Sequence, residues 1–148
     1  MVHRATDMDA VARIINHPAV YKWVTDDCSP EEYAPNERNL YIINDDATAV
    51  IRVDHFNGVT CQVHTSTTPD ITTPAKNFVM EAIEWGWKNT RYAKIISLVP
   101  SFNRLADRLA RSCGFKKEGV ITKSFLKDFR LYDQTIYGLS KYDQKGGI

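Results

Sequence analysis

Histidine is the side chain best suited to proton transfer near neutral pH, and this chain has four of them. His64 lies in a stretch of alternating residue types, in which Thr60, Gln62, His64 and Ser66 would share the polar face of a strand. On that face His64 could act as a general base that accepts a proton from an attacking nucleophile. It could also be a surface or half-buried histidine with a satisfied hydrogen bond, and the sequence leaves both interpretations open.

The other histidines are weaker candidates. His55 lies on the neighbouring predicted strand, whereas His3 and His17 are interpreted as structural, because Pro18 fixes a corner beside His17. We therefore expect the chemistry, if any, to depend on His64.

The cysteines do not predict a reactive centre. Cys28, Cys61 and Cys113 are scattered, without the spacing of a metal site or a disulfide framework. No histidine is adjacent to a cysteine that could activate it as a nucleophile. We expect reduced thiols, with Cys61 and Cys113 as small core residues, and no metal site.

A helix–strand–helix unit over residues 70–115 must position these side chains. Thr73 and Pro74 are placed as N-cap and first residue of a helix that ends near residue 89. Its apolar stripe has helical spacing and consists of Ala75, Phe78, Val79, Ala82, Ile83, Gly86 and Trp87. Residues 95–99 then form a short apolar run, typical of a strand covered on both faces, and a second helix ends at Gly114.

The remaining segments predict strands around this unit. Residues 2–5 predict a strand, Thr6 and Asp9 resemble a capping box that opens a helix, and a second helix follows from Pro18. The polar segment 25–38 is interpreted as a loop that could cover a cleft. Strands are predicted over 40–43, 49–56 and 59–66, with Asn57-Gly58 as a two-residue hairpin turn, and over 120–126 and 132–139, before a tail over 142–148.

The element order is therefore β-α-α-β-β-β-α-β-α-β-β, an α/β (mixed α+β) chain with a twisted mixed sheet and helices on both faces. Its 148 residues, 43% hydrophobic, predict a single domain over 1–148. The net charge of +1 gives no overall field that would attract nucleic acid or an anionic membrane. No apolar run approaches the length of a membrane span. From the charge and the apolar runs together, we expect neither a membrane nor a direct nucleic-acid partner.

One segment carries a family resemblance. Residues 103–119 read N-x-x-A-x-x-L-A-x-x-x-G-F-x-x-x-G, and Asp133 follows in the last strand. With the element order, this pattern resembles the GCN5-related N-acetyltransferase (GNAT) superfamily over nearly the whole chain. The segments RATDMD and INHPAVYKWV also resemble GNAT-like proteins encoded by tailed bacteriophages.

The resemblance implies an acetyl-CoA site between the strands 59–66 and 95–99. Where these strands part, unpaired backbone groups would hold the pantetheine, and the start of the following helix would hold the pyrophosphate. The corresponding cofactor residues are Thr65, Thr72, Thr73, Ala75, Lys76 and Asn103. Asn103 could also simply cap its helix. His64 is the expected general base toward an amine acceptor, because it lies on the polar face of the strand that should border this site.

Two departures from the family pattern affect these expectations. The family turn Arg/Gln-x-x-Gly-x-Gly/Ala is replaced by Thr72-Thr73-Pro74-Ala75, in which Pro74 has no N–H to offer a phosphate. Ala110 replaces the tyrosine that many members use to protonate the CoA thiolate, and Ser112 is expected on a different side of the helix. Water could serve as the acid instead, because a thiolate is a good leaving group.

Two functions therefore remain open. The first is an N-acetyltransferase that uses acetyl-CoA and an unidentified amine in a host cytoplasm. The second is a non-catalytic GNAT-like component of a phage virion, or a binder of a host protein. For the second function, Trp85 or the face formed by Arg104, Arg108 and Arg111 would contact the partner.

Overall fold

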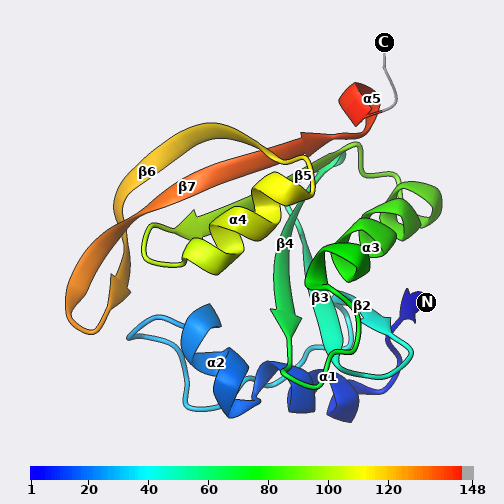
Figure 1. The fold of residues 1–148 in the computed structure, drawn as a ribbon, viewed down its shortest axis with the longest axis horizontal. Helices are drawn as coiled ribbons and strands as arrows, with labels where there is room; N and C mark the ends of the chain where they lie inside the picture. Colours follow the sequence, from blue (N-terminus) through cyan, green and yellow to red (C-terminus); the bar gives the residue numbers. More distant parts are fainter. Residues whose placement is uncertain (145–148) are drawn as a thin grey trace.

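A seven-stranded sheet with the strand order β1-β2-β3-β4-β5-β7-β6 organises the computed structural model, which describes residues 1–144 (Figure 1). The strands are β1 (Val2–Arg4), β2 (Leu40–Asn44), β3 (Ala49–His55), β4 (Thr60–Thr67), β5 (Lys94–Pro100), β6 (Lys116–Lys127) and β7 (Arg130–Ser140). The helices are α1 (Met8–Ile15), α2 (Pro18–Val24), α3 (Ala75–Asn89), α4 (Arg104–Ser112) and α5 (Lys141–Gln144). The predicted order of helices and strands is confirmed from β1 to β7. The short helix α5 then lies where the sequence predicted the start of a tail. Residues 145–148 of the predicted tail lie outside the described residues.

The sheet opens between β4 and β5, as predicted. These two strands pair in parallel over only three residue pairs, from Thr60↔Lys94 to Gln62↔Ile96. Beyond this point β4 stays paired with β3 and β5 with β7, so the backbone edges that face each other across the opening lack strand partners. Such an opening leaves main-chain donors and acceptors available to a ligand.

The helices cover both faces of the sheet, which confirms the predicted architecture. One core packs α3 against the face that carries Ile51, Cys61 and Ile95, and α4 adds partly buried side chains to it. The other core packs α1 against the face that carries Tyr41 and Val50. The predicted stripe of α3 is buried at Phe78, Val79, Ala82, Ile83 and Trp87.

Two predicted helix caps are wrong. Asp7, not Thr6, caps α1, and its carboxylate accepts hydrogen bonds from the N–H groups of Asp9 and Ala10. Pro74, not Thr73, is the N-cap residue of α3, and no side chain caps that helix. Sequence patterns locate a helix start to within a residue or two, so both errors are small in position. At α3 the shift leaves the start of the helix without a polar cap.

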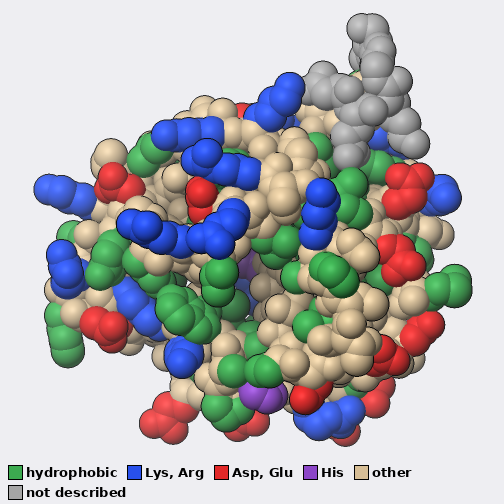
Figure 2. Space-filling view, in the orientation of Figure 1, with side chains coloured by type: hydrophobic (Ala, Val, Ile, Leu, Met, Phe, Trp, Pro, Cys, Tyr) green, Lys and Arg blue, Asp and Glu red, His purple; other side chains and the backbone are tan. Residues whose placement is uncertain are grey.

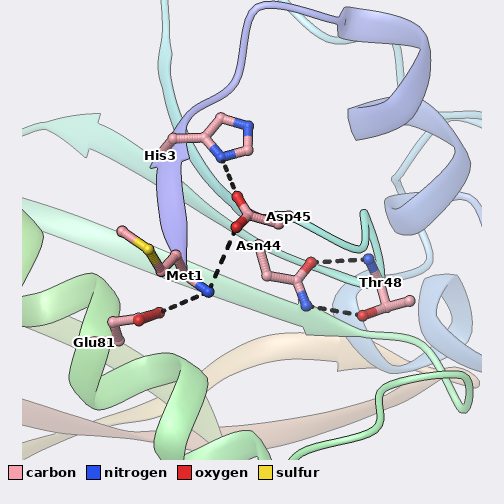
Figure 3. Close-up of polar contacts among 6 residues, drawn as sticks. All are labelled: Met1, His3, Asn44, Asp45, Thr48 and Glu81. Atoms are coloured by element: carbon pink, nitrogen blue, oxygen red, sulfur yellow. Dashed lines mark hydrogen bonds and ion pairs between the residues drawn. The ribbon is translucent and has the colours of Figure 1, made fainter.

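Polar contacts of Met1 and His3 join the start of the chain to the turn after β2 and to α3 (Figure 3). The Met1 ammonium lies 3.7 Å from Asp45 Oδ2, in the turn after β2, and 3.8 Å from Glu81 Oε2 on α3. His3 Nδ1 lies 2.9 Å from Asp45 Oδ1. These groups are solvent-exposed, so the contacts fix position more than they stabilise the fold.

The tip of the β6–β7 hairpin curves toward α2 and is bonded to the segment after it (Figure 1). The Asp27 carboxylate accepts hydrogen bonds from the N–H groups of Asp128 and Phe129, both 2.8 Å, and these bonds lower the pKa of Asp27. Lys127 Nζ donates to the carbonyls of Lys22 and Thr25. The hairpin tip is therefore bonded to the end of α2 and to the start of the 25–38 segment.

We expect Phe129→Gly to raise the free energy of unfolding by about 1 kcal/mol, because Phe129 occupies the left-handed region at φ 61°. Its side chain is 95% exposed, so the substitution removes almost no packing. Urea denaturation would measure the change. Leu131→Gly is the matched control: its side chain is 58% exposed on the same hairpin, but its φ is not positive, so it should destabilise the protein. Destabilisation by Phe129→Gly would contradict the prediction.

Candidate functional site

A cavity of about 360 Å³ lies at the opening between β4 and β5. Side chains from both faces of the sheet line it: Arg52 and His64 on the face covered by α1, and Val79, Ile83 and Leu109 on the face covered by α3 and α4. Figure 2 shows a hollow between α3 and α4 on the latter face. The cavity therefore connects the two faces through the gap in the sheet.

His64 lies in this cavity, with a carboxylate as its partner. His64 Nε2 lies 3.1 Å from Asp54 Oδ2, and the side chains are 37% and 35% exposed. Arg52 Nε lies 3.2 Å from Asp54 Oδ1, an ion pair without the alignment of a hydrogen bond. The hydrogen bond from His64, together with the charges of His64 and Arg52, lowers the pKa of Asp54. Asp54 is thus ionised at neutral pH and can hold an imidazole in one orientation.

The pairing of β3 with β4 creates this cluster. Arg52 is directly opposite His64, and Asp54 is directly opposite Gln62, so all four side chains share one face. This register differs by one residue from that of the predicted two-residue turn. The Asn57 side chain accepts hydrogen bonds from the N–H groups of Val59 and Thr60, which stabilises a longer connection. The predicted two-residue turn is therefore wrong, and its register would have separated His64 from Arg52 and Asp54.

Tyr33, in the segment between α2 and β2, packs its ring against the Arg52 guanidinium. The Arg52 guanidinium lies 5.6 Å from the centre of the Tyr33 ring, as in a cation–π contact. The Tyr33 and Tyr41 hydroxyls are 2.6 Å apart, and burial, followed by this hydrogen bond, raises the pKa of Tyr33 to about 12. Asn16 binds the Tyr33 backbone through two hydrogen bonds. The loop predicted over 25–38 is thus confirmed as irregular and is anchored at Tyr33.

Aromatic side chains form the end of the cavity beside α2. The Phe102 ring packs against those of Trp23, Phe125 and Tyr132, with centroid distances of 4.8 to 6.5 Å. Trp23 and Phe125 line the cavity, together with Asp26 and Gln134. This end can accept an apolar group, whereas the His64 cluster supplies the polar chemistry.

The α4 side of the cavity carries no acid. Ala106, Leu109 and Ala110 face it, and an alanine methyl cannot protonate a leaving thiolate. Ser112 does not replace a tyrosine here: its hydroxyl donates to the Leu109 carbonyl, and it does not line the cavity. Asn103 does line the cavity, and its side chain also caps α4 by accepting a hydrogen bond from the Ala106 N–H. Both expectations for Asn103 are thus compatible with its position.

The residues predicted to hold the pyrophosphate lie at the start of α3, outside the lining of the cavity. Thr72, Thr73 and Lys76 are exposed, and Ala75 is partly exposed. The Ala75 and Lys76 N–H groups have no hydrogen-bond acceptor in the described part of the chain. These two N–H groups and the Lys76 ammonium are the donors that this helix start offers to an anion. Thr65, by contrast, lies on β4 within the cavity.

The other candidates have structural contacts. His55 points to the opposite sheet face from His64, where its Nδ1 lies 2.8 Å from the Tyr92 hydroxyl. His17 caps α2 by accepting a hydrogen bond from the Ala19 N–H, and His3 pairs with Asp45. Cys61 and Cys113 are buried as predicted, and burial raises the pKa of the Cys61 thiol to about 11. That thiol is therefore not a nucleophile near neutral pH.

The two predicted partner surfaces differ in exposure. Trp85 is partly buried and packs against the α3 core, so the prediction that it marks a contact surface is not supported. Arg104, Arg108 and Arg111 are exposed, in the region of α4 where Figure 2 shows Lys and Arg side chains gathered. Arg111 also contacts Asp107 and the Tyr137 hydroxyl, which ties it to the fold.

Sequence reasoning missed Asp54 and Arg52. Their alternation on the predicted 49–56 strand was a usable signal, because polar residues two apart share a face. Whether that face also carries His64 depends on the strand register, which the predicted turn placed one residue off. The electrostatic partners of His64 were therefore not accessible from the sequence.

No protein-family profile and no curated protein sequence matches this chain. Solved structures do. Spermidine N-acetyltransferase from Vibrio cholerae, in complex with CoA and spermine, superposes with a TM-score of 0.75 at 13% identity, over 95% of both chains. A ribosomal-protein-alanine N-acetyltransferase from Brucella melitensis gives a TM-score of 0.71 at 13% identity, over 95% of this chain and 99% of that one. The protein yncA from Salmonella typhimurium, a putative acetyltransferase solved with acetyl-CoA, gives a TM-score of 0.72 at 15% identity, over 95% of this chain and 93% of that one.

At this identity the likeness shows a shared fold, that of the GNAT acetyltransferases, which confirms the predicted fold class. Among the described residues, no helix is long and apolar enough to cross a membrane. Within the same residues, no group of three or more His, Cys, Asp or Glu side chains is placed to hold a metal ion.

Proposed function

We propose that this protein is an acetyl-CoA-dependent N-acetyltransferase with a weakened cofactor site. The observation that carries the proposal is the position of His64: it lies in a cavity that opens through the gap between β4 and β5 and has a carboxylate partner. The structural neighbours support the reaction class, since their names describe transfer to spermidine and to a ribosomal protein. In two of them, CoA or acetyl-CoA is bound.

In this reaction the acceptor amine attacks the thioester carbonyl carbon. The C–N bond forms, the C–S bond breaks, and the electron pair of the C–S bond leaves on the CoA sulfur. His64 would take the proton that the amine loses. The thiolate would take its proton from water, because Ala110 offers none. The pantetheine would add along the free edge of β4 near Thr65, and the phosphates would bind at Ala75 and Lys76, with Thr72 and Thr73 hydroxyls as further donors.

We expect acetyl-CoA to bind weakly, with little or no thermal shift at sub-millimolar concentration, because Pro74 withholds one N–H and no glycines shape the turn. A thermal melt with and without acetyl-CoA would test this. A family member with micromolar affinity would gain about 2.7 kcal/mol at a hundredfold excess over Kd. A shift of that size would show that the Thr72–Lys76 segment compensates for the missing donors.

A second candidate function is a non-catalytic one, as a virion component of a tailed phage or as a binder of a host protein. Ala110 and the uncapped start of α3 favour it, because neither is needed for a scaffold role. The phage resemblance, and with it a virion or host-cytoplasm location, stays a prediction. Turnover of acetyl-CoA with any amine would exclude this candidate. No binding at saturating acetyl-CoA, combined with stoichiometric recovery from purified particles, would support it.

A further inference from the structure

We propose that Asp54 is a positioning residue for His64: it holds the imidazole in the Nε2–H tautomer and so leaves Nδ1 as the atom that accepts the substrate proton. The kinetic part of this inference rests on the proposed function; the tautomer itself does not. Arg52 and Tyr33 complete the assembly, because they hold Asp54 in place.

The contact between the two side chains determines the tautomer. Asp54 Oδ2 lies 3.1 Å from His64 Nε2, and an ionised carboxylate can only accept a hydrogen bond. The neutral imidazole must therefore carry its proton on Nε2, since an unprotonated Nε2 would bring two lone pairs together. Nδ1 is then unprotonated, and no described residue donates a hydrogen bond to it. It is the free basic atom of this ring.

The carboxylate is itself fixed from two sides. Its other oxygen, Oδ1, lies 3.2 Å from Arg52 Nε. Arg52 is held between Asp54 and the Tyr33 ring, and Tyr33 is anchored by Asn16 and Tyr41. A histidine with a carboxylate partner resists rotation and gains stability when it becomes an imidazolium, which is the state that forms on proton uptake.

The charges around His64 agree with this role. Asp54 and Arg52 face it from β3, and Asp26 lines the same cavity from the segment after α2. Arg52 neutralises one carboxylate, so the surroundings of His64 carry a net charge of about −1 when the imidazole is neutral. The Asp54 carboxylate, in direct contact with His64, therefore faces the ring when proton uptake makes it a cation.

The tautomer can be measured directly by NMR of the imidazole nitrogens in the full-length protein, at about pH 8, where histidines are mostly neutral. The signals of His64 are identified by their loss in His64→Ala. We expect a protonated Nε2 and an unprotonated Nδ1 in the wild type, and a mixture of tautomers in Asp54→Asn. An Nδ1–H tautomer in the wild type, or an unchanged His64 spectrum in Asp54→Asn, would overturn the proposal.

Asp45→Asn is the matched control, because Asp45 forms the exposed His–Asp contact with His3 shown in Figure 3. It removes one carboxylate beside one histidine, as Asp54→Asn does, but at a residue that does not line the cavity. We expect Asp45→Asn to change the signals of His3 and to leave those of His64 unchanged. A response of His64 to Asp45→Asn would mean that the spectra report general charge effects and would count against the specific Asp54 contact.

Kinetics supply the second arm once an acceptor amine has been found. We expect Asp54→Asn to lower kcat roughly 10–100-fold with KM for acetyl-CoA nearly unchanged. A rise in KM alone, with kcat unchanged, would make Asp54 a structural residue and overturn the positioning role. If no acceptor is turned over, the proposed function fails, yet the NMR result still decides the tautomer.

Discussion

His64→Ala is expected to lower kcat by roughly 10²–10⁴-fold while acetyl-CoA binding is retained, because the proposed function makes His64 the proton acceptor and places the cofactor contacts on other residues. His64 is 37% exposed at the cavity, so its truncation should not unfold the protein. Single-turnover rates with an amine acceptor would measure the loss, and the dependence of those rates on acetyl-CoA concentration would measure binding.

His55→Ala is the control for this experiment. His55 lies on the adjacent strand β3 but points to the other face of the sheet, where it contacts Tyr92 and does not line the cavity. We expect this variant to retain wild-type turnover. If His64→Ala were equally active, His64 would be a structural histidine bound to Asp54, the interpretation that the sequence left open, and proton loss would have to proceed through solvent.

The fold could be predicted from the sequence because its signals are local. The apolar stripe of α3 repeats with helical spacing, and β5 is a short apolar run between two helices, so neither depends on distant residues. The gap between β4 and β5 could also be predicted, but only through the family resemblance. The two strands are distant in the sequence, and the residues of one strand do not indicate which other strand it pairs with.

The site was less predictable because it depends on register. A one-residue shift between β3 and β4 would place His64 opposite Ile51 rather than Arg52, on the face covered by α3. That register is set by Asn57, whose side chain bonds two N–H groups in a connection longer than the Asn57-Gly58 pattern predicted. The Asp54 contact therefore follows from turn chemistry that propensities do not resolve.

Phe78→Ala is expected to lower the free energy of unfolding by roughly 3–5 kcal/mol, the largest effect on stability among these variants. Phe78 is 4% exposed at the centre of the α3 stripe and belongs to the core between α3 and the sheet. Removing its ring deletes buried apolar surface and leaves a cavity that the surrounding strands can only partly fill. Urea denaturation would show a lower midpoint with an unchanged m-value.

Asn77→Ala provides the comparison, because Asn77 precedes Phe78 on the same helix but is exposed. It should change the free energy of unfolding by no more than about 0.5 kcal/mol. A loss below about 1 kcal/mol for Phe78→Ala would mean that α3 presents a different face to the sheet. Val79 and Ile83, which line the cavity from the same stripe, would then be displaced as well.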